Sequence, residues 1–481
     1  MDILEAAFHP KAIAIAGASE NPFSFGYHYV RHLLDYGYPG HIYPVNPNKQ
    51  VVHGVKAYPD LSSIPEPVDY VICCLPASKV LGLLAQCAAQ GVKVVHLVTA
   101  RLSETGRQEG KDLEFRILQE ARRLNIRLIG PNCMGIYYPG GGIALGYAMP
   151  REDGTVGAVF QSGGAADILI HCGELQGLRF SKVISYGNAI DLDESDFLHY
   201  LTYDDETKII GAYIEGVKDG RKLLNALADA ARIKPVVAIK GGRGIAGTKA
   251  AASHTAAIAG SDIMWETAFK KARVIQARDM SELIDFLVAF SFLPPIRGNR
   301  VGLIGAGGGM AVMSADVCEQ AGLVVPPLPP EIRQELRTKA PEIWDWLDNP
   351  MDVSIMDGMM MMDFQEALGE VPRMLATSPH FDFIIAEIAQ GNPMPEEIWI
   401  SIVRNQVEGI INLAAEQLKP VVSVVSDGKV TSDQIQDWHW EVLAEVRARL
   451  VAAHIPTYST VGEAAKAMRQ FTDYWQIRAE T

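Results

Sequence analysis

One histidine of this sequence stands in a sterically open stretch. His254 is flanked by small side chains on both sides, in the run Ala250-Ala251-Ala252-Ser253-His254-Thr255-Ala256-Ala257. An imidazole without bulky neighbours can be reached by a second molecule, and its unprotonated nitrogen is a nucleophile. A lone histidine is more often an ordinary surface or core residue, but these neighbours favour one that a second molecule can reach.

A phosphorylated histidine needs a carboxylate to orient it and a site that holds the anion. Glu215 follows a predicted strand at 209–214, and a carboxylate that accepts one ring N–H leaves the other nitrogen as the nucleophile. Ser162, Gly163 and Gly164 open an apparent helix, whose free backbone N–H groups attract phosphate. The alternatives are a solvated strand-end acid for Glu215 and a structural turn for the glycines.

A second glycine-containing turn, Gly17-Ala18-Ser19, closes a predicted strand and leads to a helix expected to begin near Tyr27. Such a turn lets the backbone approach a phosphate closely, which favours a nucleotide-like ligand over a purely structural turn. It departs from the dinucleotide fingerprint because the third glycine is missing and Gly26 lies too far along the chain. The stretch 242–249 has the glycine spacing of a phosphate loop but ends in Thr248-Lys249, the reverse of the required order.

Strands must position these residues, and the first 140 residues alternate short β-branched runs with helical stretches. The predicted strands are 12–16, 42–47, 68–76, 93–98 and 126–129. Strands separated by helices indicate βαβ units and a parallel sheet, in which ligands bind beyond the carboxyl ends of the strands.

The remaining sequence is internally duplicated. Residues 156–164 align without a gap to residues 301–309, each run giving a strand, a glycine-rich turn and an apparent helix. Later in each half, Lys234-Pro235-Val236-Val237 is matched by Lys419-Pro420-Val421-Val422. Two related α/β units are therefore expected, divided near the proline-rich turn 293–298.

Composition limits the classes of function. The 481 residues predict about three domains at ~100–200 residues each. The net charge of −14 and the lack of a basic block argue against nucleic acid as a partner. No secretory signal or membrane-spanning run is recognised, and the six cysteines show no zinc spacing, so we expect a cytoplasmic protein that does not bind a membrane.

Taken together, the motifs resemble those of a known enzyme family, and the resemblance covers nearly the whole chain. The sequence resembles the α subunit of ADP-forming (nucleoside-diphosphate-forming) acyl-CoA synthetases, which are ligases related to succinyl-CoA synthetase. The matching motifs occur in the family's order: Gly17-Ala18-Ser19, Tyr43-Pro44-Val45-Asn46-Pro47, Gly130-Pro131-Asn132-Cys133, Gln161-Ser162-Gly163-Gly164, Tyr213-Ile214-Glu215-Gly216 and Ser253-His254-Thr255.

The resemblance implies an α/β fold in three parts. These are a Rossmann-like CoA-binding domain at 1–140, a flavodoxin-like (succinyl-CoA synthetase-like) ligase subdomain with the phosphohistidine loop at 150–294, and a second such subdomain at 298–475. It implies that His254 is phosphorylated, that Glu215 orients it, and that Ser162, Gly163 and Gly164 hold phosphate. The residues implied to border coenzyme A are Gly17, Ala18, Ser19, Val45, Asn46, Pro47, Pro76 and Asn132.

The resemblance also implies partners. Nothing in the sequence resembles the ATP-grasp domain that exchanges the phosphoryl group with ADP, so an ATP-grasp β subunit is expected in a hetero-oligomer. ADP or ATP and Mg²⁺ would bind only through that subunit, with no metal held by this chain. The substrate would be a small carboxylic acid or its CoA thioester.

Two departures from the family concern activity. Ala256 replaces the usual glycine after Ser-His-Thr, and the turn Thr99–Glu104 replaces a glycine-rich acidic turn near the expected thioester. The absent ATP-grasp domain and Ala256 leave a non-catalytic, CoA-binding regulatory module as the alternative. An NAD(P)-dependent oxidoreductase is disfavoured by the missing third glycine and by the lack of a clear ribose-binding acid.

Overall fold

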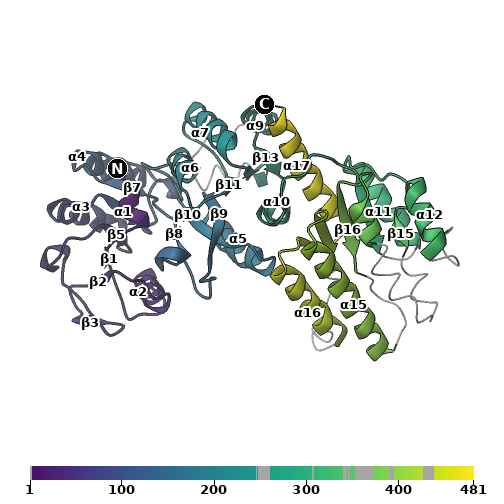
Figure 1. Ribbon diagram of the computed structural model, residues 1–481. Helices are drawn as coiled ribbons and strands as arrows, with labels where there is room; N and C mark the ends of the chain where they lie inside the picture. Colours follow the sequence, from purple (N-terminus) through teal and green to yellow (C-terminus); the bar gives the residue numbers. More distant parts are fainter. Residues whose placement is uncertain are drawn as a thin grey trace. The chain divides into compact units, whose positions relative to one another are not determined.

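The computed structural model (Figure 1) describes residues 3–244, 246–247, 261–305, 308–339, 344, 347–352, 372–388, 395–425 and 438–480. The chain divides into two compact units, 1–283 and 284–481, and the division falls within α10 (Met280–Phe292). Three sheets built mainly of parallel strands carry helices between successive strands. The predicted α/β fold class is confirmed.

The first sheet contains five parallel strands in the order β2-β1-β5-β6-β7. Each strand falls on one of the five β-branched runs of the sequence. The strands are β1 (Ala12–Ala16), β2 (His41–Val45), β5 (Tyr70–Cys73), β6 (Val94–Leu97) and β7 (Arg127–Ile129). A small antiparallel hairpin, β3 (Val51–Val52) with β4 (Val55–Lys56), follows β2.

Helices cover both faces of this sheet because successive strand residues point to opposite faces. Ile13 and Ile15 share a core with α1 (Glu5–Phe8) and α2 (Phe25–Asp35). Ala12, Ala14 and Ala16 of the same strand share a different core with α3 (Val80–Ala89) and α4 (Gln108–Arg123).

The second sheet has the order β13-β12-β11-β9-β10-β8. Its strands are β8 (Gly135–Tyr137), β9 (Asp153–Phe160), β10 (Phe180–Ser185), β11 (Ile209–Ile214), β12 (Val236–Lys240) and β13 (Ile275–Ala277). All neighbours are parallel except β8, which runs antiparallel to β10 at the edge. β8 therefore pairs with the second sheet although it lies inside the range 1–140 predicted for the first domain.

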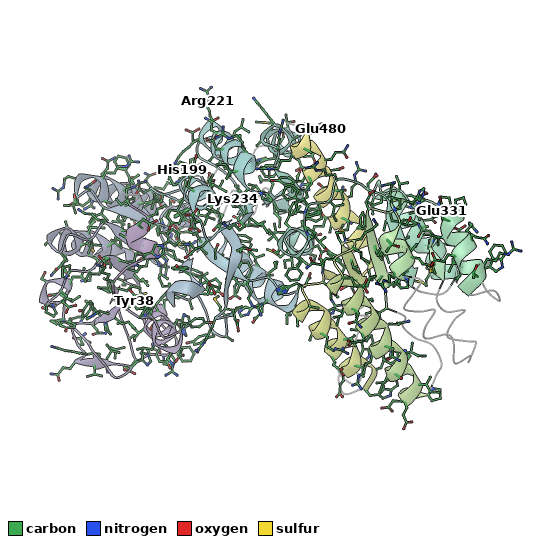
Figure 2. All side chains as sticks on the ribbon, in the orientation of Figure 1. Tyr38, His199, Arg221, Lys234, Glu331 and Glu480 are labelled. Atoms are coloured by element: carbon green, nitrogen blue, oxygen red, sulfur yellow. The ribbon has the colours of Figure 1, made fainter. Side chains whose placement is uncertain are left out.

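Four helices flank the second sheet. α5 (Gly163–Leu175) contacts β9 and β10. α6 (Glu194–Tyr203), α7 (Gly220–Ile233) and α9 (Asp262–Ala272) contribute side chains to one shared core. In α7, Leu223 and Leu227 are buried while the charged Arg221 projects outward (Figure 2), which is the amphipathic pattern of a helix packed on a sheet.

The second unit repeats this arrangement. Its parallel sheet has the order β15-β14-β16-β17-β18, with β14 (Val301–Gly305), β15 (Met351–Asp352), β16 (Phe383–Glu387), β17 (Val421–Val424) and β18 (Thr457–Tyr458). Its helices are α11 (Gly308–Gln320), α12 (Pro330–Lys339), α15 (Glu396–Ala415), α16 (Trp438–Ala452) and α17 (Val461–Ala479). α5 and α11 begin at Gly163 and Gly308, positions that the sequence repeat aligns. Among the described residues, no helix has both the length and the apolar character needed to cross a bilayer.

Candidate functional site

The turn after β1 brings four of the predicted CoA-binding residues into direct contact. The carbonyl oxygen of Val45 accepts hydrogen bonds from the backbone N–H groups of Gly17 at 3.0 Å and Ala18 at 3.2 Å. The side-chain amide of Asn46 donates to the carbonyl oxygen of Ala18 at 2.7 Å. Gly17 has φ +91°, and a Cβ there would lie 3.2 Å from the Cys74 backbone. The turn thus has the tight, glycine-dependent backbone that a close-approaching phosphate group needs.

Helix α2 begins at Phe25, two residues earlier than expected, because Ser24 caps it by accepting from the N–H of Tyr27. The chain reaches this cap through a turn in which the Ser19 hydroxyl accepts from the N–H of Asn21 at 3.0 Å. Gly26 lies in the first turn of the helix, and a Cβ there would sit 1.9 Å from the carbonyl oxygen of Gly17. Gly26 therefore permits the close helix–strand approach that the third fingerprint glycine provides, despite its distance along the sequence.

The remaining predicted CoA-binding residues fall in two places. Pro47 and Pro76 follow β2 and β5, the strands on either side of β1, so they lie at the same carboxyl edge as Gly17. Asn132 follows β7 at the far end of the strand order. Its φ is +55°, and its N–H donates to the carbonyl oxygen of Thr99 at 2.9 Å. Asn132 thus lies three strands away from β1 in the sheet and lines a cavity.

This cavity, of about 260 Å³, is lined by the three predicted phosphate-binding residues. Its lining residues lie on loops and helix starts that follow strands of the first two sheets: Phe25, Val98, Ala100, Asn132, Cys133, Met134, Gln161, Ser162, Gly163, Gly164, Gly187 and Asn188. Residues that border the carboxyl edge of the first sheet thereby face the N-terminus of α5 across one cavity. The arrangement lets a ligand held at the first sheet meet an anion held at the helix.

The two glycines at the start of α5 have different surroundings. Ser162 caps the helix, and its hydroxyl accepts from the N–H of Ala165 at 3.3 Å. A Cβ on Gly163 would lie 2.4 Å from the Cγ of Met134, whereas a Cβ on Gly164 would meet nothing within 4 Å. Gly163 is therefore required by packing against the cavity wall, and Gly164 borders open space beside the helix N-terminus.

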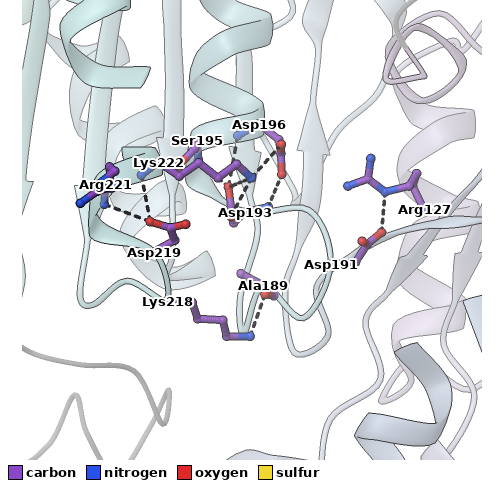
Figure 3. A network of polar contacts seen from close by, with 10 residues as sticks. All are labelled: Arg127, Ala189, Asp191, Asp193, Ser195, Asp196, Lys218, Asp219, Arg221 and Lys222. Atoms are coloured by element: carbon purple, nitrogen blue, oxygen red, sulfur yellow. Dashed lines mark hydrogen bonds and ion pairs between the residues drawn. The ribbon is translucent and has the colours of Figure 1, made fainter. Parts of the chain in front are cut away.

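The loop after β10 supplies two cavity residues that sequence reasoning missed, Gly187 and Asn188. Gly187 has φ +57°, and the N–H of Asn188 donates to the carbonyl oxygen of Pro131 at 3.0 Å. The ammonium of Lys218 donates to the carbonyl oxygens of Asn188 at 3.1 Å and Ala189 at 2.8 Å; Figure 3 draws the bond to Ala189. No strand is predicted here from the sequence, so a glycine followed by an asparagine at 187–188 gave no basis for assigning these residues to a site.

Further along the same loop, ion pairs join it to neighbouring elements (Figure 3). Asp191 accepts from the guanidinium of Arg127 on β7 at 2.7 Å and from the N–H of Leu128 at 2.9 Å. Lys222 on α7 bonds to the carboxylates of Asp193 and Asp196, each at 2.9 Å. The loop is thus attached to the first sheet on one side and to α7 on the other, which fixes the backbone next to the cavity.

Glu215 follows β11, as predicted, and its backbone N–H donates to the side-chain oxygen of Gln161 at 2.8 Å. The Tyr213 hydroxyl hydrogen-bonds to the Glu215 carboxylate; burial, and then this carboxylate, raises the pKa of Tyr213 to about 12. His254 lies outside the described residues. The orientation of His254 by Glu215 therefore stays a prediction.

The cavity also holds a cysteine, but its environment does not favour nucleophilic chemistry. Burial raises the pKa of the Cys133 thiol above its usual value. A thiol kept protonated is a poor nucleophile, since the thiolate is the reactive form. Among the described lining residues, the groups suited to bind an anion are the backbone N–H groups at the start of α5 and the side-chain amides.

Comparisons with known proteins agree with this architecture. Residues 11–139 match the CoA binding domain family, and residues 153–290 match the succinyl-CoA ligase like flavodoxin domain family. The α subunit of acetate–CoA ligase (ADP-forming) II from Pyrococcus furiosus is 35% identical over 384 residues, which cover 80% of this chain and 82% of that protein. Acetate–CoA ligase (ADP-forming) from Methanocaldococcus jannaschii is 36% identical over 347 residues, which cover 72% of this chain and 48% of that protein.

A solved structure matches along the entire length. It is that of acetyl-coenzyme A synthetase 1 from Ca. Korarchaeum cryptofilum, described as dinucleotide forming and determined with phosphate and ADP. The TM-score is 0.84 at 28% identity, and the match covers 100% of both chains. The two matched domain families and these relatives together establish that the chain belongs to the family of α subunits of ADP-forming acyl-CoA synthetases.

Proposed function

We propose that this chain forms an acyl phosphate from an acyl-CoA thioester and inorganic phosphate, and then carries the phosphoryl group on His254. One cavity supports this most directly. It is lined by Asn132, at the carboxyl edge of the first sheet, and by Ser162, Gly163 and Gly164, at the N-terminus of α5. A thioester reaching over the sheet edge and a phosphate at the helix would meet there. Such juxtaposition is the main requirement of a two-substrate transfer.

Coenzyme A would be held at the carboxyl edge of the first sheet. The tight turn at Gly17 and Ala18, joined to Val45 and Asn46, has the backbone that fits a phosphate-bearing ligand, with Ser19, Pro47 and Pro76 beside it. A Cβ at Gly17 would lie 3.2 Å from the Cys74 backbone, so the glycine allows the turn to pack tightly against the end of β5. Asn132 would border the thioester end of the ligand and not its nucleotide end.

The phosphoryl group would then pass from the acyl phosphate to His254, releasing the carboxylic acid. Glu215 would accept one ring N–H of His254 and leave the other nitrogen free to attack phosphorus. The small residues around His254 suit a segment that moves between an acyl site and a nucleotide site, because the two sites cannot share one location. All steps would be reversible, so the same residues would serve acyl-CoA synthesis.

The second half-reaction would need a partner. We infer an ATP-grasp β subunit that binds ADP and Mg²⁺ and takes the phosphoryl group from His254. Two observations support this inference. The P. furiosus relative is itself named as a subunit, and the M. jannaschii relative extends over about twice the aligned length.

Thiol release and CoA binding, measured side by side, test the proposed function. The full-length chain would be mixed with inorganic phosphate and acetyl-CoA, isobutyryl-CoA or phenylacetyl-CoA, and free thiol and intact mass would be followed. We expect thiol release with one added phosphoryl group from at least one thioester. The His254→Ala variant should bind CoA normally and gain no phosphoryl group. Equal loss of CoA binding and phosphorylation in that variant would count against the assigned role.

A further inference from the structure

Gln161 occupies a distinctive position in the cavity. It lies between the end of β9 and the Ser162 cap of α5, so its side chain sits at the junction of strand, helix and cavity. It is only 6% exposed, yet it lines the cavity beside the predicted phosphate-binding residues. Most polar groups buried this deeply have a hydrogen-bond partner, so a group without one requires an explanation.

One end of the Gln161 amide is committed to the protein. Its oxygen, Oε1, accepts from the backbone N–H of Glu215 at 2.8 Å and from that of Gly216 at 3.2 Å. Only an oxygen can accept from two N–H groups, so the amide orientation is fixed by this network. Nε2 must therefore be the other end, and among the described residues it donates to no protein acceptor. The result is an oriented N–H donor beside the cavity.

We propose that Gln161 is a further catalytic residue whose Nε2–H donates to the carbonyl oxygen of the acyl thioester while phosphate attacks. The inference rests on the proposed function of this chain. As a phosphate oxygen bonds to the carbonyl carbon, the carbonyl π electrons move to oxygen, which becomes negative. Collapse restores the C=O bond and breaks the C–S bond. The sulfur leaves with that electron pair and takes the proton of hydrogen phosphate, giving acyl phosphate and free CoA.

The two hydrogen bonds that Oε1 accepts hold the Gln161 amide in one orientation, which suits this role. A donor held in place before the reaction stabilises developing charge without reorganising, and the removal of one such donor typically lowers kcat by about 10²- to 10³-fold. The two N–H groups that lock the amide belong to Glu215 and the residue after it. The same strand end would thereby align the donor for the first step and the carboxylate for the second.

Two substitutions separate this role from a structural one. Gln161→Glu keeps an oxygen for the N–H groups of Glu215 and Gly216 but replaces the donor with a second acceptor. Gln161→Ala removes both. If Gln161 only held the backbone, Gln161→Glu would react like the wild type and Gln161→Ala alone would lose activity and stability. A donor to the oxyanion predicts that Gln161→Glu is impaired at least as strongly as Gln161→Ala.

The measurement is the single-turnover rate of thiol release by the full-length chain, with saturating inorganic phosphate and the thioester that the wild type uses best. Melting temperature and CoA affinity are recorded alongside. We expect Gln161→Glu to melt and to bind CoA like the wild type and to react about 100-fold more slowly. A Gln161→Glu rate within about threefold of an active wild type would overturn the inference and leave the proposed function standing. No thiol release by the wild type would overturn both.

Discussion

The carboxylate of Glu104 accepts a hydrogen bond from the side-chain amide of Asn188 at 3.0 Å. The same carboxylate accepts from the backbone N–H groups of Arg101 and Leu102, and Arg101 has φ +71°. Glu104 therefore shapes the turn that carries Ala100 into the cavity and ties it to Asn188 on the opposite wall. Glu104 belongs to the turn Thr99–Glu104, where the sequence is expected to depart from the family.

This relationship predicts that Glu104→Ala lowers the free energy of unfolding by about 1–3 kcal/mol, because three N–H donors lose a shared acceptor. It should also reduce kcat/KM for the acyl thioester, since the two cavity walls lose their connection. CoA affinity should change little, because the turn at Gly17 is not involved. Denaturant unfolding and single-turnover thiol release check the result, with Glu104→Gln as the milder control. A Glu104→Ala variant as stable as the wild type would contradict the account.

The two glycines of α5 should respond differently to alanine. Gly163→Ala should destabilise the chain by about 1–3 kcal/mol, because its Cβ would overlap Met134. Gly164→Ala meets no neighbouring atom and should leave the melting temperature unchanged or slightly raised. If phosphate binds at this helix N-terminus, Gly164→Ala should nevertheless raise the KM for phosphate. Equal stability of the two variants would contradict the close packing of Gly163 against Met134.

Gly26→Ala tests the close approach of α2 to the CoA-binding turn. The added Cβ would meet the carbonyl oxygen of Gly17, so the helix must shift away from the turn. We expect CoA affinity, measured by isothermal titration calorimetry, to fall by about tenfold or more. A matched control is Gly82→Ala in α3, where a Cβ would meet nothing within 4 Å. Unchanged CoA affinity in Gly26→Ala would place the CoA site elsewhere.

His96 predicts a dependence of stability on pH. Burial lowers the pKa of His96 to about 4 from its ordinary value of 6.5. The unfolded chain therefore binds more protons than the folded chain between these values. The contribution of neutral His96 to the free energy of unfolding is fully present above pH 6.5. It is lost as the pH falls toward 4, by about 3 kcal/mol in all. Unfolding free energies of wild type and His96→Gln should converge over this window; parallel curves would contradict the assignment.

The sequence was sufficient for features that depend on local pattern. All five strands of the first sheet, the duplication of the flavodoxin-like unit and the strand-end positions of Gly17 and Glu215 follow from periodicity and turn residues. The helix expected to begin near Tyr27 begins at Phe25, directly after the Ser24 cap. The spacing of Gly26 along the chain argues against a role as the third glycine of the dinucleotide fingerprint. Its role depends instead on its distance in space from Gly17.

The composition of the cavity could not be read from the sequence. Asn132 is predicted to border coenzyme A together with Gly17, and this stays a prediction; the strand order shows only that Asn132 follows the edge strand β7 and lines the cavity beside α5. Gln161 and Asn188 were not assigned roles, because the contacts that orient them come from Glu215 and Glu104, which are remote in sequence. Periodicity identifies where each strand ends, but not which loops of two different sheets meet.

The central claim is that His254 carries the phosphoryl group released from the acyl phosphate. The most direct test is to incubate the full-length chain with phosphate and a reactive acyl-CoA, digest it under alkaline conditions that preserve phosphohistidine, and locate the modification by mass spectrometry. We predict a single phosphorylated peptide that contains His254 and that does not form without acyl-CoA. Thiol release with the phosphoryl group on another residue, or with none on the protein, would contradict the account.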